Sequence, residues 1–167
     1  GEFSFHDDHT VAQIAPSGDF YGGLVTTANY DNPLLSQAWK TALNLNESGD
    51  STDLYIGRRN VEGGGRQDDI RHTSYRGVIG LKGDLGDAWS YDVSALVGKV
   101  IYQETYKNDF SNTRLSRALD VVSYTDPVTN EVSARCRSWV DGSDTSCVPY
   151  NIWAIGGVTP DALAYLQ

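Results

Sequence analysis

The sequence predicts an all-β protein built from long antiparallel strands. Two segments with alternating polar and apolar residues flank a short turn, and successive side chains of a strand point to opposite faces of a sheet. Much of the remaining chain is rich in Gly, Asn, Ser and Thr, which favour loops. No run of about 18 apolar residues occurs, so the sequence excludes a membrane-spanning helix.

The N-terminal part is predicted to be a strand end followed by a long loop. Aromatic and polar residues alternate over residues 1–11, which indicates a strand. Residues 12–53 are then too long for an ordinary connection in a compact domain. Inside this loop, apolar residues at helical spacing predict a short helix over residues 33–45, with Asn32 as its N-cap and Pro33 in its first turn.

Two long strands are predicted in the middle of the chain, over residues 54–83 and 89–110. Glycine and aspartate residues over 84–88 predict a tight turn between them. In the second strand the odd-numbered positions from Trp89 to Val97 are apolar and the even-numbered ones mostly polar. This stretch matches the roughly 9–11 residues that a tilted membrane-spanning strand needs. Alternation alone is equally compatible with a soluble antiparallel sheet.

The glycine-rich stretch "RRNVEGGGRQDD", residues 58–69, has the composition of a phosphate-binding loop. Such a loop follows a strand and opens a helix, whereas the residues after it here alternate as a strand does. The spacing also lacks the GxGxxG and GxxxxGK[ST] patterns. We therefore expect the glycines to permit a bulge or a close backbone approach within a long strand.

The last part, residues 111–167, is predicted to be a strand end followed by another long loop. Thr159 and Pro160 predict the start of a helix. Cys136 and Cys147 flank a segment of turn residues, which favours a disulfide over two free thiols and an oxidising compartment. Two cysteines are too few for a structural zinc site.

Composition excludes several classes of function. The formal net charge is −9 with a pI near 4.6, so the chain lacks the clustered cations that bind nucleic acid. In "HDDH", residues 6–9, strand geometry brings no more than two side chains to one face. No nucleophile is paired with a base in any known catalytic pattern. We expect no enzyme activity, no catalytic residue, no cofactor and no metal site.

Charged residues on the two long strands are the candidate site. Arginines recur along the first strand and acidic residues lie on the next, so cross-strand charge pairs could line a water-filled lumen or face a ligand. Ordinary solvated ion pairing is the simpler interpretation for any single residue. The candidate lumen-facing or ligand-facing residues are Arg58, Arg66, Arg76, Asp92 and Glu104.

The blocks "RRNVEGGGRQDD" and "GDLGDAWSYD" carry a family resemblance, which extends over essentially the whole chain. The sequence closely resembles the barrel portion of TonB-dependent outer-membrane receptors of Gram-negative bacteria. The resemblance implies antiparallel strands of a large transmembrane β-barrel of about 22 strands, with long extracellular loops carrying short helices. It also implies active uptake of a scarce nutrient of the siderophore, vitamin or glycan class.

The same resemblance implies partners and sidedness. Membrane lipids, the plug and the other strands of the same receptor, and the TonB complex acting through an N-terminal part are the implied partners, with an unknown small-molecule substrate. The turn at 84–88 would be periplasmic, and the loops at 12–53 and 111–167 extracellular. The absence of Met and the ending within a predicted helix suggest a piece of a longer protein.

A different class of function also fits the sequence. The chain would then be a soluble or surface-attached β-rich binding or adhesion module. Its ligand would be a carbohydrate that stacks on the aromatic side chains of Trp39, Trp139 and Trp153.

Overall fold

The computed structural model describes residues 1–20 and 25–167, which fold into two compact units. The first, called here the sheet unit, consists of Gly1–Ile14 and Gln67–Lys107. The second, called the disulfide unit, consists of Ala15–Arg66 and Asn108–Gln167. Each unit is described by itself.

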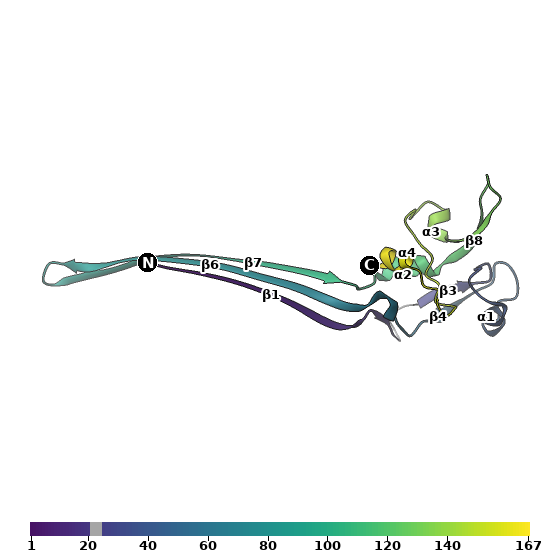
Figure 1. Ribbon diagram of the computed structural model, residues 1–167, viewed down its shortest axis with the longest axis horizontal. Helices are drawn as coiled ribbons and strands as arrows, with labels where there is room; N and C mark the ends of the chain where they lie inside the picture. The colour runs from purple at the N-terminus through teal and green to yellow at the C-terminus, as the bar shows by residue number, and fades with distance from the viewer. Residues whose placement is uncertain (21–24) are drawn as a thin grey trace. The chain divides into compact units, whose positions relative to one another are not determined.

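Three long strands make up the sheet unit. They are β1 (Glu2–Pro16), β6 (Gly65–Leu85) and β7 (Trp89–Lys107), in the order β1-β6-β7, and they run side by side in Figure 1. Strands β6 and β7 pair antiparallel without interruption from Gln67↔Lys107 to Leu85↔Trp89. A continuous ladder fits their alternating sequence, because every residue then keeps its side chain on one face.

The turn between β6 and β7 occupies only three residues. Gly86 has a φ of +71°, a left-handed conformation that residues with a side chain adopt at a cost. The strands therefore reverse direction at the glycine- and aspartate-rich segment where the sequence predicts a tight turn.

The disulfide unit contains short strand pairs and helices. Its helices are short, and only α2 exceeds two turns. Its strand pairs are β2 (Gly18–Asp19) with β5 (Arg58–Arg59), β3 (Val25–Asn29) with β4 (Ser51–Tyr55), and β8 (Val121–Thr125) with β9 (Val132–Cys136). Its helices are α1 (Gln37–Ala42), the 3₁₀-helix η1 (Val61–Gly63), α2 (Asn112–Leu119), α3 (Arg137–Val140) and α4 (Pro160–Leu166).

Helices α2 and α4 supply most of the main core of the disulfide unit. The side chains of Leu115, Ala118 and Leu166 are almost completely buried there, together with Tyr150. Both helices begin at a capping side chain, since Ser111 accepts a hydrogen bond from the backbone N–H of Arg114 and Thr159 from that of Ala162. The predicted helix start at Thr159 is thus confirmed.

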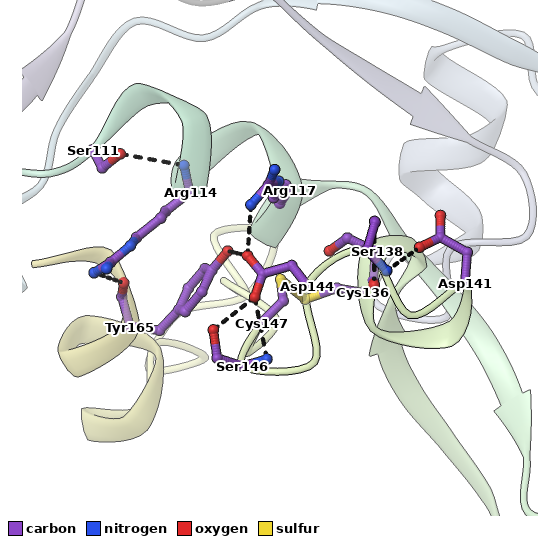
Figure 2. A network of polar contacts seen from close by, with 11 residues as sticks. Ser111, Arg114, Arg117, Cys136, Ser138, Asp141, Asp144, Ser146, Cys147 and Tyr165 are labelled. Atoms are coloured by element: carbon purple, nitrogen blue, oxygen red, sulfur yellow. Dashed lines mark hydrogen bonds and ion pairs between the residues drawn. A yellow bond between two sulfur atoms is a disulfide. The ribbon is translucent and has the colours of Figure 1, made fainter.

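A disulfide joins Cys136 to Cys147 and belongs to this core. Both half-cystines are buried, and their Cα atoms lie 6.1 Å apart. Between them in the sequence, Asp144 accepts hydrogen bonds from the Tyr165 hydroxyl at 2.7 Å and from Arg117 at 2.8 Å (Figure 2). The loop closed by the disulfide is therefore also tied by a carboxylate to α2 and α4.

The prediction of a transmembrane β-barrel of about 22 strands is wrong for this chain. The described strands form one sheet of three strands and three sheets of two, and none of these sheets closes. Twenty-two strands of roughly 9–11 residues would need about 200 residues before any loop, more than the 167 present. Alternation reports the two faces of one strand, but it carries no information about how many strands share a sheet.

Several element boundaries also differ from those expected. Residues 33–45 contain a helix only over Gln37–Ala42, and its N-cap is Ser36. Asn32, the predicted cap, is fully buried, and its side chain instead accepts a hydrogen bond from the backbone N–H of Leu34. An Asx turn at Asn32 therefore precedes the helix, which begins one turn later.

The long strand expected over residues 54–83 is interrupted at the glycines. Strand β4 ends at Tyr55, and η1 precedes the start of β6 at Gly65. Gly64 has a φ of +76°, and a Cβ on Gly63 would lie 2.7 Å from the Phe110 ring. The glycine run therefore permits a turn and a close approach of an aromatic ring to the backbone.

Candidate functional site

One face of the sheet unit carries a continuous band of exposed apolar side chains. The register between β6 and β7 pairs odd-numbered residues with odd-numbered ones, as in Ile79↔Ala95 and Leu81↔Val93, so these side chains share a face. Val97 is 77% exposed and Ile79 68%. We call this band the apolar belt: Tyr75, Ile79, Leu81, Leu85, Trp89, Tyr91, Val93, Ala95 and Val97, with Phe3 and Phe5 of β1.

Strand β1 contributes its two phenylalanines to this belt. The rings of Phe5 and Tyr75 lie 5.2 Å apart, and Phe3 lines a shallow groove with Ile79 and Val97. All three strands of the sheet unit therefore present apolar groups on the same face. A contiguous apolar surface of this kind is unusual on a protein surrounded by water and marks contact with another molecule or a membrane.

The opposite face of the sheet is mostly polar at the same height. The register places Lys82 opposite Asp92 and Asp84 opposite Ser90. Further along, Val78 lies opposite Leu96, so this face is mixed. The sheet thus has one apolar and one predominantly hydrophilic face over the length of the belt.

Beyond the belt, its face changes from apolar to charged. Asp7 of β1 accepts hydrogen bonds from the guanidinium of Arg71 at 2.9 and 3.2 Å and from the hydroxyl of Thr73 at 2.6 Å. The next pairs join Asp69 to His9 at 2.7 Å and to Lys107 at 2.6 Å. These six residues form what we call the charged ladder. The residue numbers of the paired side chains increase along β1 while they decrease along β6, so these two strands are antiparallel.

Both outer edges of the three-stranded sheet lack a neighbouring strand within the described residues. Strands β1 and β7 each pair only with β6, and every residue of β7 is exposed. An edge strand of this length presents a row of unpaired backbone N–H and C=O groups, which readily pair with a further strand. Both edges are therefore open to pairing with a further strand.

The structure distributes the five candidate residues between two regions. Arg76, Asp92 and Glu104 occupy even-numbered positions of β6 and β7, on the face opposite the belt. Arg76 pairs with Glu2 at 2.9 Å, and Glu104 accepts a hydrogen bond from Tyr102 at 2.7 Å. Arg71 and Arg76 of β6 pair with Asp7 and Glu2 of β1, rather than with Asp92 or Glu104 of β7. Sequence reasoning missed these partners because it did not pair β1 with β6.

Arg58 and Arg66 belong to the disulfide unit. Arg66 donates to the backbone carbonyl of Ala15 at 3.0 Å and lies 3.6 Å from a carboxylate oxygen of Asp109. Arg58 forms an ion pair with Glu62 and donates to the Tyr150 hydroxyl at 2.6 Å. The structure therefore gives both arginines protein partners.

Tyr150 and Asn60 complete the polar cluster around Arg58. The Tyr150 hydroxyl donates to the buried Asn60 side chain at 2.9 Å, and burial raises the pKa of Tyr150 to about 12. Asn60 in turn donates to Asp19 at 3.2 Å. This chain of satisfied bonds holds β5 against the main core.

Comparison with known proteins identifies no relative. No protein-family model, curated protein or solved structure matches the chain. No group of three or more His, Cys, Asp or Glu residues in the described ranges 1–20 and 25–167 is placed to hold a metal ion. None of the helices in those ranges is long and apolar enough to cross a membrane.

Proposed function

We propose that the chain is part of a TonB-dependent receptor in the outer membrane of a Gram-negative bacterium, active in the uptake of a scarce nutrient. The observation that carries this proposal is the two-faced sheet: an apolar belt of exposed side chains lies opposite a mostly hydrophilic face. Strands of outer-membrane proteins alternate in this way because one face contacts lipid and the other contacts water.

The length of the belt supports a membrane location. From Trp89 to Val97, β7 presents an apolar side chain at every odd position, and nine residues approach the roughly 9–11 that a tilted strand needs to cross the hydrocarbon. On the same face the charged ladder follows. Ion pairs are costly in hydrocarbon but tolerated in the headgroup region and beyond it. The length of the belt and the change to charged residues beyond it both support contact with lipid.

The exposed aromatic residues next to the turn also support this location. Trp89 is 76% exposed, and Tyr91 follows on the same face of β7. Such amphipathic rings are enriched where the hydrocarbon meets the headgroups. The three-residue turn beside them contrasts with the long connections of the disulfide unit. Short turns face the periplasm in this class and long loops face outward, so we assign the turn to the periplasmic side.

The unpaired edges of β1 and β7 support a role as part of a larger receptor. In lipid, each unpaired backbone N–H or C=O group costs several kcal/mol. A membrane location therefore requires further strands along both edges. Membrane lipids and the remaining strands of the receptor are the partners that this arrangement needs.

Labelling in intact cells tests the proposed location and sidedness. Val128, at the tip between β8 and β9, is 87% exposed, and Asp87 lies in the three-residue turn. With a membrane-impermeant maleimide, we expect Val128→Cys to react in intact cells and Asp87→Cys to react only after the outer membrane is permeabilised. Equal reaction at both positions, or recovery of the protein in a membrane-free fraction, would contradict the proposal.

Uptake itself is tested by comparing cells with and without the gene that encodes this chain. Growth is measured separately on limiting ferric chelate, limiting vitamin and limiting oligosaccharide, in strains with and without a working TonB system. We expect loss of the gene to impair growth on one of the three nutrients, only where TonB is active. Unchanged growth in all three media would contradict a role in uptake.

A further inference from the structure

A cavity in the disulfide unit is bounded by two tryptophans from distant parts of the chain. Its volume is about 290 Å³, at the lower end of the size of small-molecule sites. Helix α1 contributes Trp39 and its C-cap residue, Leu43, and Trp153 comes from the segment before α4. The remaining wall is supplied by the end of β4, the two residues between β4 and β5, Arg58 of β5, and Ile152. We call it the tryptophan cavity.

The two indoles are held at a fixed angle. Their ring centroids lie 5.6 Å apart with the planes at 72°, and Nε1 of Trp39 donates to the backbone carbonyl of Trp153 at 3.3 Å. Edge-to-face aromatic pairs are favourable, and the hydrogen bond restricts rotation of the Trp39 side chain. The cavity therefore presents an aromatic corner that needs little reordering to accept another ring.

The wall between β4 and β5 leaves open space. A Cβ placed on Gly57 would meet no atom within 4 Å. Among the described residues, the cavity therefore has room beside Gly57 for a bound ring.

Arg58 is the one ionisable guanidinium in the cavity wall, and its terminal nitrogens are already engaged. They bond Glu62, the Tyr150 hydroxyl and the Asn60 side chain at the distances of ordinary or shorter hydrogen bonds. Because Glu62 balances the charge of Arg58, the cavity offers little attraction to an anion. The wall chemistry favours an uncharged ring system over a charged one.

We propose that the tryptophan cavity binds an uncharged, planar aromatic group. Such a group stacks on the indoles and fills the space beside Gly57. The assignment of this aromatic group to the nutrient that the receptor takes up rests on the proposed function. Binding to the cavity is a property of the disulfide unit and is measured separately from membrane insertion and growth.

The test uses the whole chain in detergent solution and three bicyclic probes. They are 2-naphthol, which is aromatic and uncharged at neutral pH, its saturated counterpart decahydro-2-naphthol, and the anion 2-naphthoate. Affinity is measured by calorimetry and by quenching of tryptophan fluorescence. Since aromatic pairs add about 0.5–1.5 kcal/mol beyond burial, we expect 2-naphthol to bind roughly threefold to tenfold more tightly than its saturated counterpart. We also expect it to bind more tightly than the anion.

A cavity-filling variant shows whether binding occurs at this position. A Cβ at Gly57 meets no atom within 4 Å, so Gly57→Leu adds bulk to the cavity, and we expect the same near-ultraviolet circular dichroism and loss of 2-naphthol binding. Gly77→Leu is the matched control, because a Cβ there also meets no atom within 4 Å and Gly77 belongs to the sheet unit. It should leave the affinity unchanged.

Three results would overturn the inference. They are equal affinity for the aromatic and saturated probes, retained binding in Gly57→Leu, or equal loss of binding in Gly57→Leu and Gly77→Leu. If Gly57→Leu changes the circular dichroism, Trp153→Leu replaces it as the test variant with the same expected loss of binding. A negative result in the probe-binding test does not affect the labelling and growth results. A negative result in the labelling or growth test does not affect the measured probe affinities.

Discussion

The two units of this chain differ in where they place their apolar side chains: the disulfide unit buries them and the sheet unit exposes them. The disulfide unit buries Leu115, Ala118 and Tyr150 in a core that also holds a disulfide. The sheet unit, all of whose residues are described, contains no buried residue at all. The disulfide unit therefore contains its own apolar partners, whereas the apolar side chains of the sheet unit stay exposed.

Truncation of one apolar side chain in each unit sharpens this comparison, and we expect the largest effect in the core. Leu115 is 1% exposed, so Leu115→Ala should destabilise the disulfide unit by about 2–5 kcal/mol through lost burial and a residual cavity. Ile79 is 68% exposed, so Ile79→Ala should have almost no effect in aqueous buffer. Denaturant unfolding followed by near-ultraviolet circular dichroism measures both. Equal losses would show that the sheet unit has a core of its own.

Charge placed on either face of β7 is expected to have the next largest effect. In lipid vesicles, Val93→Arg should cost about 2–4 kcal/mol if this position lies near the middle of the bilayer. Ser94→Arg, one residue along on the opposite face, should be mild. The free energy of insertion is measured by denaturant titration in the presence of vesicles. Similar costs for both variants would contradict the assignment of the two faces.

Removal of the disulfide should affect only the unit that contains it. Cys136 and Cys147 are 11 positions apart, and loop closure of this size restricts the unfolded chain by roughly 3 kcal/mol. We expect the double variant Cys136→Ser, Cys147→Ser to lower the stability of the disulfide unit by about that amount, as measured by thermal and denaturant unfolding. An equal shift in a signal from the sheet unit, such as fluorescence of Trp89 in a variant lacking the other three tryptophans, would contradict independent units.

The polar contacts of Asp144 are expected to have a smaller effect, which is a dependence of stability on pH. Hydrogen bonds from Ser146 and Tyr165, together with Arg117, hold the pKa of Asp144 well below its ordinary value of 3.8. Their contribution to stability is thus present above pH 3.8 and is lost as the pH falls further. Burial and the bond to Asp144 raise the pKa of Tyr165 to about 12, so its contribution is complete below pH 10 and is lost as the pH rises toward 12.

Unfolding measured across pH checks both limits. We expect Asp144→Asn to weaken the acid-dependent loss of stability, and Tyr165→Phe to weaken the alkaline one. Arg114→Gln is the control, since the Arg114 side chain contacts Tyr165 through its backbone carbonyl and its ring but makes no described hydrogen bond to the Asp144 carboxylate. Unchanged pH profiles in both test variants would contradict the assigned role of this carboxylate.

The sequence was sufficient for features that depend on neighbouring residues. Alternation identifies the two faces of β7, the glycine and aspartate residues identify the turn after Leu85, and Thr159 identifies the start of α4. Features that depend on distant residues were missed. No local pattern indicates that Arg71 pairs with Asp7 in β1, that Phe110 packs on Gly63, or that Trp39 meets Trp153. The number of strands in a sheet is such a property too, which is why the predicted barrel was wrong for this chain.

The most direct test of the central claim compares the environments of two adjacent side chains of β7. Val93→Cys and Ser94→Cys are each labelled with an environment-sensitive nitrobenzoxadiazole group, with the native disulfide left oxidised, and the chain is added to vesicles of outer-membrane lipids. We predict that the label at residue 93 emits as in hydrocarbon and is quenched by lipid-attached nitroxides, whereas the label at residue 94 emits as in water. Aqueous emission at both positions would contradict the claim that the apolar belt contacts lipid.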